Sequence, residues 1–204
     1  MNSVAACSST ACKMVDSLRI GVFKGANNPH QYLFLLSIVN LFKTDPERVN
    51  RFPLNEELIS EFENVCGLLT GSQWQKRIQI EYPYYHLSKN PEKIWRLIIR
   101  PCMDERFSYY ETIHKGRLTL KRLIETIDYG VLGDDIVGIF REESSRNELY
   151  SLLLEKIAHL TKEGGRMNDR GNPNEKTDYS CVACGQGDSF LCYLNSIQQS
   201  HGSN

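Results

Sequence analysis

The chain has 204 residues, of which 41% are hydrophobic and 24% charged, and its formal net charge at pH 7 is −1. This length suits one principal domain with a sizeable core, and the composition excludes a fully disordered or fibrous chain. The longest apolar run, residues 32–39, is far shorter than the roughly 18 residues that span a bilayer, so we expect no membrane segment.

The first half of the chain predicts three helices. Residues 1–12 are small and polar and predict a disordered leader, without the basic and apolar regions of a secretory signal. Apolar positions in residues 13–23 predict a first helix. Residues 30–42 are apolar over a helical length and predict a central buried helix. We expect Asn55 to cap the next helix, because apolar residues with a 3-4 spacing follow it. These residues are Leu58, Ile59, Phe62, Val65 and Leu69.

Two runs in the middle of the chain have the composition of strands. Residues 77–81 alternate in polarity, and residues 94–99 are rich in β-branched and aromatic side chains. We predict that the two runs pair around a surface loop at residues 82–87. The predicted fold is therefore mainly α with a small β-strand pair (α+β), in a single helical domain.

The second half of the chain returns to helical patterns. Short helices are predicted at residues 118–124 and 136–140, with a connecting segment between them, and a longer helix at residues 145–160. Residues 163–178 are rich in Gly, Asn, Asp and Lys and predict a linker. A cysteine-containing tail follows at residues 179–204.

The segment Tyr82-Pro83-Tyr84-Tyr85-His86-Leu87 is the most unusual feature of the sequence. It lies in a basic stretch, residues 73–122, with 11 Lys and Arg against 5 Asp and Glu, whereas the remainder of the chain has 13 against 20. Aromatic rings beside positive charge suit a nucleic-acid backbone or base. The alternative is that the aromatic side chains pack beneath a strand pair, with Pro83 at its edge, and that the basic stretch is an ordinary solvated surface.

His30 opens the predicted helix at residues 30–42, where first-turn amides and the helix dipole attract an anion such as phosphate. A plain capping or surface histidine is the alternative interpretation. The run Pro29-His30-Gln31-Tyr32-Leu33-Phe34-Leu35-Leu36 resembles the Pro-His-Lys-Pro motif and leucine run in sulfur-binding domains of phosphorothioate-dependent type IV (HNH) restriction endonucleases. The aromatic segment, with Trp95 downstream, resembles their Tyr-Pro-Phe-x-x-Leu segment.

Helix spacing also supports this resemblance, from Thr119 through Asp135 to Leu160. The resemblance covers about residues 14–162 and implies one DNA-binding domain at residues 13–162. It implies recognition of double-stranded DNA in which sulfur replaces one non-bridging phosphate oxygen. An apolar pocket holds the soft sulfur at little desolvation cost but leaves an oxygen anion poorly solvated.

Site residues are carried over from the family motifs. Tyr82 and Pro83 would supply the ring faces of the sulfur pocket, with His86 on its rim. His30 and Gln31 would meet the phosphate group. Two of these residues depart from the family: Gln31 lacks the usual positive charge, and His86 stands where a small apolar residue would leave a cleaner pocket. Another modification or ordinary duplex DNA therefore stays open as the ligand.

Three arginines in the basic stretch are candidates for neighbouring phosphates, chosen from charge and proximity in the sequence alone. They are Arg96, Arg100 and Arg106.

The tail contains Cys181-Val182-Ala183-Cys184-Gly185, which resembles the Cys-x-x-Cys-Gly opening of the HNH nuclease that follows the binding domain in this family. Only 19 residues follow Gly185, with one histidine and no His-Asn-His arrangement, so we assign no catalytic residue. A Cys₃His zinc site in the tail stays open. Its ligands would be Cys181, Cys184, Cys192 and His201.

The seven cysteines are an odd number without a regular framework, which favours reduced thiols and a cytoplasmic protein. The sequence therefore predicts a cytoplasmic, non-enzymatic protein, linked to restriction of modified DNA, that binds phosphorothioated duplex DNA without a required cofactor. Two alternatives remain: a zinc-containing HNH-type endonuclease completed by a longer or partner chain, and a protein-interaction module. A homodimer stays open as the assembly state.

Overall fold

The computed structural model describes residues 9–23, 26–70, 79–115 and 117–166. The helices are α1 (Thr10–Asp16), α2 (His30–Thr44), α3 (Glu56–Thr70), α5 (Glu81–His86), α6 (Asp104–His114), α7 (Leu120–Thr126), α8 (Asp134–Arg141) and α9 (Glu143–Arg166), and a 3₁₀ turn, η1 (Leu87–Lys89), follows α5. The strands are β1 (Gly21–Phe23), β2 (Ala26–Asn28), β3 (Trp95–Ile99) and β4 (Ile127–Leu132). β1 pairs with β2 and β3 with β4, both antiparallel. The prediction of a mainly α fold with a small β component is confirmed.

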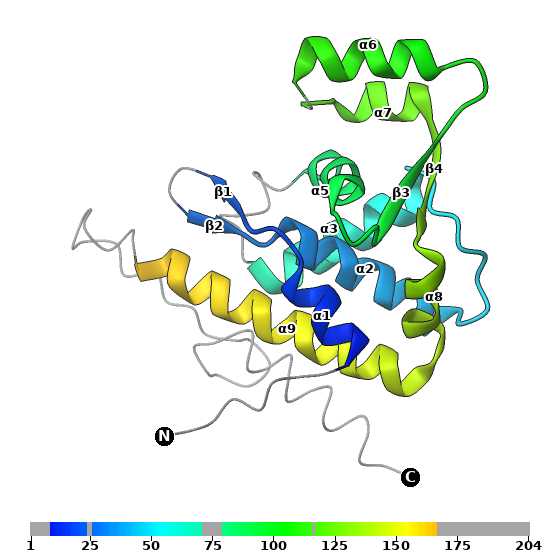
Figure 1. Ribbon diagram of the computed structural model, residues 1–204. Coiled ribbons are helices and arrows are strands. Elements are labelled where there is room, and N and C mark those ends of the chain that lie inside the picture. The colour runs from blue at the N-terminus through cyan, green and yellow to red at the C-terminus, as the bar shows by residue number, and fades with distance from the viewer. Residues whose placement is uncertain (1–8, 24–25, 71–78, 116, 167–204) are drawn as a thin grey trace, which may run out of the picture.

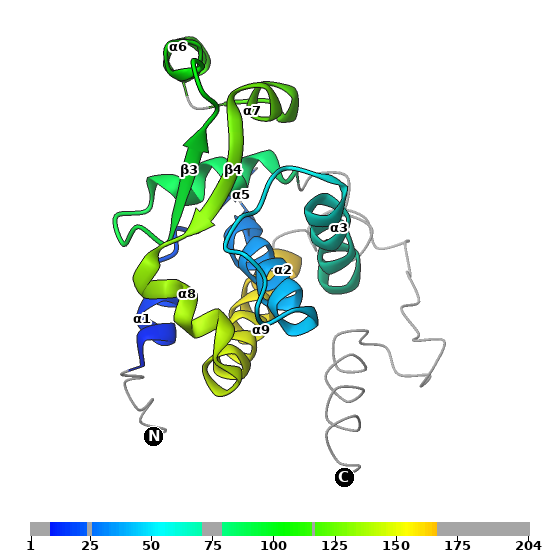
Figure 2. The same cartoon turned by 90° about the vertical axis from the view of Figure 1, so that its right-hand side faces the viewer.

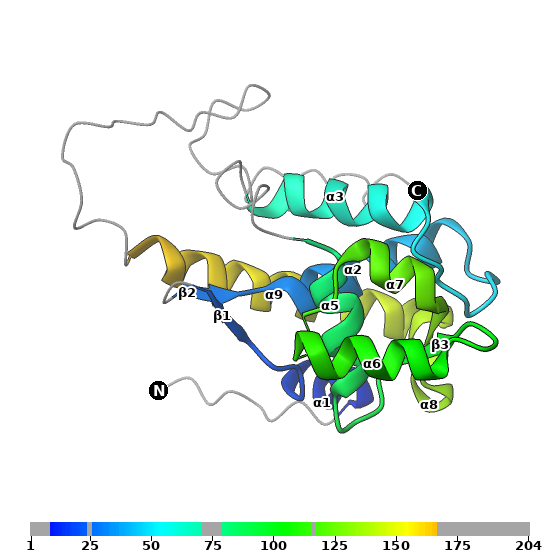
Figure 3. The same ribbon diagram turned by 90° about the horizontal axis from the view of Figure 1, so that it is seen from above.

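Helix α2 is the centre of the fold. Its residues from Tyr32 to Val39 are all buried, as expected for a helix that is apolar on every side. It contacts α3, α9, α5 and α8, and Figures 1 and 3 show α3 and α9 on either side of it. The predicted central helix is therefore confirmed. Within the described ranges, no helix combines the length and the apolar character needed to cross a bilayer.

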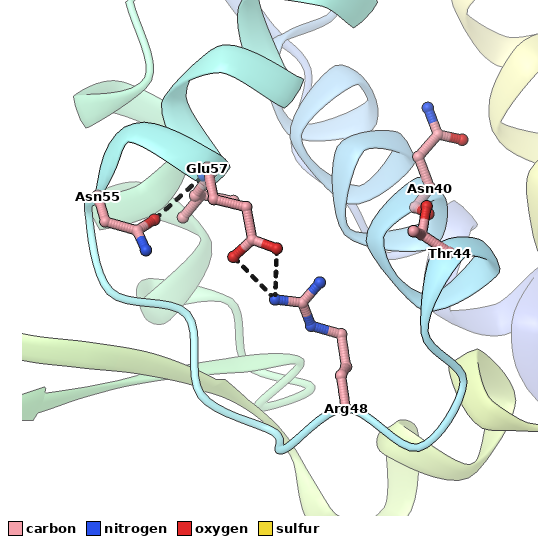
Figure 4. A network of polar contacts seen from close by, with 6 residues as sticks. Asn40, Thr44, Arg48, Asn55 and Glu57 are labelled. Atoms are coloured by element: carbon pink, nitrogen blue, oxygen red, sulfur yellow. Dashed lines mark hydrogen bonds and ion pairs between the residues drawn. The ribbon is translucent and has the colours of Figure 1, made fainter.

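The start of α3 follows the sequence prediction. The Asn55 side-chain oxygen accepts a hydrogen bond from the backbone N–H of Leu58 at 3.1 Å, which satisfies one of the amides that a helix start leaves open. Arg48 and Glu57 form an ion pair at 3.2 Å that ties the preceding loop to the first turn (Figure 4). The predicted apolar face packs into the core, with Ile59 only partly buried.

One of the two strands in the predicted pair is wrong. β3 lies within the predicted run at residues 94–99, but it pairs with β4, with Trp95 opposite Leu132. Gln79–Glu81 contains no strand, and residues 77–78 lie outside the described residues. Nor are residues 82–87 a loop, because α5 and η1 cover them. Pro83 is compatible with this helix since it is in the first turn, where its missing N–H would have no helical partner.

Helices α6 and α7 lie together beyond one end of the β3–β4 pair, away from α2 (Figures 1 and 2). We call these two helices and the connection between them the α6–α7 arm, residues 104–126. Helix α7 lies close to its predicted position, as does α8 beyond the strands. The start of α6 was not predicted from the sequence.

The ends of the domain also differ from prediction. The leader predicted at residues 1–12 is too long, because α1 begins at Thr10 and the hydroxyl oxygen of Ser9 caps it by accepting from the Cys12 N–H at 3.2 Å. The predicted first helix ends at Asp16 instead of residue 23. Helix α9 continues to Arg166, into the segment predicted to be a linker. Residues 1–8 and the rest of the linker lie outside the described residues.

Candidate functional site

A pocket of about 290 Å³ opens where the start of α2 meets α5. All five residues that the family resemblance assigns to sulfur or DNA contact line it, although they come from two distant segments of the chain. The remaining lining residues come from the segment before β1, the end of β2 and η1. The complete lining is Arg19, Ile20, Asn28, His30, Gln31, Tyr82, Pro83, His86 and Lys89.

The aromatic segment divides between the pocket and the core. Tyr84 and Tyr85 are buried, and the Tyr84 hydroxyl donates to the backbone carbonyl of Phe52 at 2.9 Å. Tyr82 is 37% exposed and lines the pocket, together with His86 one helical turn later. Tyr84 and Tyr85 therefore fit the interpretation as packing residues, whereas Tyr82 and His86 are placed where they could contact a ligand.

Three rings stand in a stack at the pocket wall. The ring centroids of His30 and Tyr82 are 6.2 Å apart with planes at 25°, and those of Tyr82 and His86 are 6.4 Å apart with planes at 2°. Tyr82 thus contributes a fixed, flat surface beside the buried ring of Pro83. Such a surface offers van der Waals contact to a polarisable group without offering it a positive charge.

Both imidazoles are neutral at neutral pH. Burial, followed by repulsion from His86, lowers the pKa of His30 to about 4. The pKa of His86 is also lowered, first by burial and then by the neighbouring Lys89. The two histidines therefore act as hydrogen-bonding groups at this pH and bring no formal charge to a ligand.

Two buried polar atoms at the pocket have no hydrogen-bond partner among the described residues: His30 Nδ1 and Asn28 Oδ1. Asn28 is only 4% exposed. Native structures pair nearly all buried polar atoms with protein or water, so these two atoms have hydrogen-bonding capacity that the described residues leave unused.

The three arginines proposed from charge alone do not line the pocket. Arg96 lies 3.6 Å from Asp134, and Arg106 lies 2.8 Å from Glu125. The Arg100 guanidinium donates to the backbone carbonyls of Ile124 and Ile127. The structure gives all three a local partner, and the basic residues that it places at the pocket are Arg19 and Lys89.

Sequence reasoning missed Arg19, Ile20, Asn28 and Lys89. Lys89 is in the basic stretch and one turn beyond the aromatic segment, so helical spacing could have identified it once the segment was recognised as a helix. Asn28 is two residues before His30 and could have been found by proximity in the sequence. Arg19 carries no such signal, because the β1–β2 hairpin brings it to the start of α2.

No protein-family model matches the chain, and neither does any curated protein. The resemblance to sulfur-binding domains therefore rests on the two short motifs and the helix spacing alone. The structure adds that the residues of the two motifs line one pocket.

The four predicted zinc ligands lie outside the described residues. Within the described ranges, no group of three or more His, Cys, Asp or Glu side chains is arranged to hold a metal. Cys12, Cys66 and Cys102 form no disulfide bond with another described residue.

Proposed function

We propose that this chain binds double-stranded DNA that carries a phosphorothioate linkage, with the sulfur seated against Tyr82 and Pro83. The observation that carries the proposal is the convergence of His30, Gln31, Tyr82, Pro83 and His86 on one pocket. The two motifs lie in distant segments of the sequence, and the packing of α5 on α2 brings their residues to one pocket.

The chemistry of the pocket favours sulfur over oxygen at one non-bridging position. The Tyr82 and Pro83 rings offer apolar contact, and both histidines are uncharged near neutral pH. A phosphate oxygen placed against these rings would lose water without gaining a hydrogen bond from them. Sulfur is larger and less well hydrated, so it loses less on entering the same place.

Backbone binding is assigned to the α6–α7 arm. Lys115, Arg117, Lys121 and Arg122 lie within eight positions, and no ion pair joins any of them to another described residue. Arg122 lies over the ring of Tyr110. Basic side chains without a carboxylate partner are suited to displacing counterions from a duplex. In this proposal the arm supplies affinity for any DNA, and the pocket supplies the preference for sulfur.

We propose that residues 13–162 bind DNA and catalyse no reaction. The cysteines of the described residues form no disulfide bond with one another, and the chain has an odd number of cysteines; both observations favour a reducing compartment such as the cytoplasm.

The test is a paired gel-shift titration with two duplexes of one sequence at one salt concentration, one with a phosphorothioate linkage and the other unmodified. We expect the wild-type chain to bind the modified duplex more tightly, and Tyr82→Ala to remove this preference. Tyr109→Ala is the matched control for the preference: Tyr109 is 60% exposed on α6 and does not line the pocket, so this substitution should leave the ratio of the two affinities unchanged. Equal affinity of the wild-type chain for both duplexes would refute the proposal.

A further inference from the structure

The residues that line the pocket differ in how far their charges are balanced by neighbouring groups. None of the described residues that line it is acidic. Four of them are basic by type, but His30 and His86 are neutral near pH 7, for the reasons given above. Among the described lining residues, Arg19 and Lys89 are therefore the side chains that carry a positive charge near pH 7 before a ligand binds.

Lys89 is already held by a carboxylate. Its ammonium nitrogen lies 2.7 Å from Oε1 of Glu111 on α6, and the hydroxyl of Tyr85 donates to the same oxygen at 2.6 Å. A ligand that recruits Lys89 must compete with this ion pair. A half-exposed ion pair of this kind contributes little free energy, but it gives Lys89 a carboxylate partner on the α6–α7 arm.

Arg19 is in a different situation. It is exposed, it lines the pocket, and no ion pair joins its guanidinium to another described residue. Its backbone N–H donates to the side-chain oxygen of Gln31 at 3.2 Å, which fixes this part of the chain against the first turn of α2. This hydrogen bond positions the backbone of Arg19, while its guanidinium has no ion pair with another described residue.

We propose that Arg19 is the cation that holds the negative charge of the bound linkage, and that it is the principal charge-bearing contact of the pocket. A guanidinium can donate two parallel hydrogen bonds to one phosphate group, which gives it an advantage over an ammonium at such a place. Arg19 supplies one positive charge without a carboxylate partner among the described residues, and an internal diester linkage carries one negative charge. This inference rests on the proposed function, since it requires an anionic ligand at the pocket.

The test uses the same two duplexes and measures affinity at several salt concentrations. We expect Arg19→Gln to weaken binding of the modified duplex on the order of tenfold to a hundredfold, and to make the slope of log K against log salt shallower by about 0.9. Arg19→Lys should keep the wild-type slope at an intermediate affinity. Arg141→Gln is the control, because this residue follows Phe140, which packs on Phe42 at the other end of α2.

A charge relocation separates a binding role from a structural one. Gln31 lines the same pocket, so the double variant Arg19→Gln/Gln31→Arg returns a guanidinium to it. We expect the double variant to recover the wild-type salt slope and part of the lost affinity. Circular dichroism and thermal unfolding establish that each variant is folded.

The two proposals can fail separately. If the wild-type chain prefers the modified duplex but Arg19→Gln binds it with unchanged affinity and slope, the role of Arg19 is refuted and sulfur recognition stands. If Arg19→Gln loses affinity equally for both duplexes, and the wild-type chain shows no preference, sulfur recognition is refuted while Arg19 remains an anion contact.

Discussion

The imidazole of His30 and the phenol ring of Tyr82 lie 6.2 Å apart, centroid to centroid, with their planes at 25°. One ring starts the central buried helix, and the other projects from a short helix that packs on it. Tertiary packing thus places a neutral hydrogen-bonding group beside an apolar surface. This combination is suited to a ligand with a hard, hydrated side and a soft one.

The burial of His30 predicts a characteristic acid sensitivity. Its pKa is about 4 in the folded chain against 6.5 when exposed, so between these values the unfolded chain binds more protons than the folded one. Stability should therefore be complete above pH 6.5 and fall as the pH is lowered toward 4, by no more than about 3 kcal/mol from this residue. Urea unfolding at a series of pH values measures the slope.

A matched variant isolates this contribution. His30→Gln keeps hydrogen-bonding capacity but cannot take up a proton, so its stability should vary less than that of the wild-type chain between pH 6.5 and 4. An identical pH dependence in the two proteins would show that His30 is not the titrating group.

Gly130 predicts a severe effect of a small substitution. A Cβ atom built on Gly130 would lie 2.0 Å from the indole of Trp95, which is fully buried. The same residue exchanges two backbone hydrogen bonds with Phe52, so the strand cannot move away without breaking them. Gly130→Ala should cost about 3 kcal/mol or more, measured by urea unfolding.

Gly138 provides the control for this substitution. It lies in α8, and a Cβ there meets nothing within 4 Å. Gly138→Ala should leave stability unchanged or raise it by about 0.5–1 kcal/mol, because alanine loses less conformational entropy in a helix. If both variants lost the same stability, close contact with Trp95 would not be the reason for glycine at position 130.

Local patterns predicted the helices well because their signals are local. The uninterrupted apolar run of α2 and the cap at Asn55 depend on neighbours within a few residues. β4 was missed because Asp128, Tyr129 and Gly130 have the composition of a turn. They form a strand because Gly130 allows the indole of Trp95 to pack against the backbone, a long-range contact that no local pattern contains.

The candidate site divides in the same way. Residue type and order identified His30 and Tyr82, and the structure brings them together. The arginines chosen by proximity in the sequence do not line the pocket, and the fold gives each of them a local partner instead. Arg19 reaches the pocket through the fold of the hairpin, and charge counting over a sequence window could not identify it.

Substitutions in the α6–α7 arm should weaken DNA binding equally whether or not the duplex carries a phosphorothioate linkage. Arg117 and Lys121 are exposed in the arm and have no ion pair with another described residue. Arg117→Gln and Lys121→Gln should each weaken binding of modified and unmodified duplexes by the same factor, and each should make the salt slope shallower by about 0.9. The ratio of the two affinities should stay at its wild-type value, since neither residue lines the pocket.

Gel-shift titration at four salt concentrations gives both quantities, and Arg141→Gln again serves as the basic control. If the arm variants altered the ratio while leaving the slope unchanged, the separation of affinity in the arm from selectivity in the pocket would be wrong.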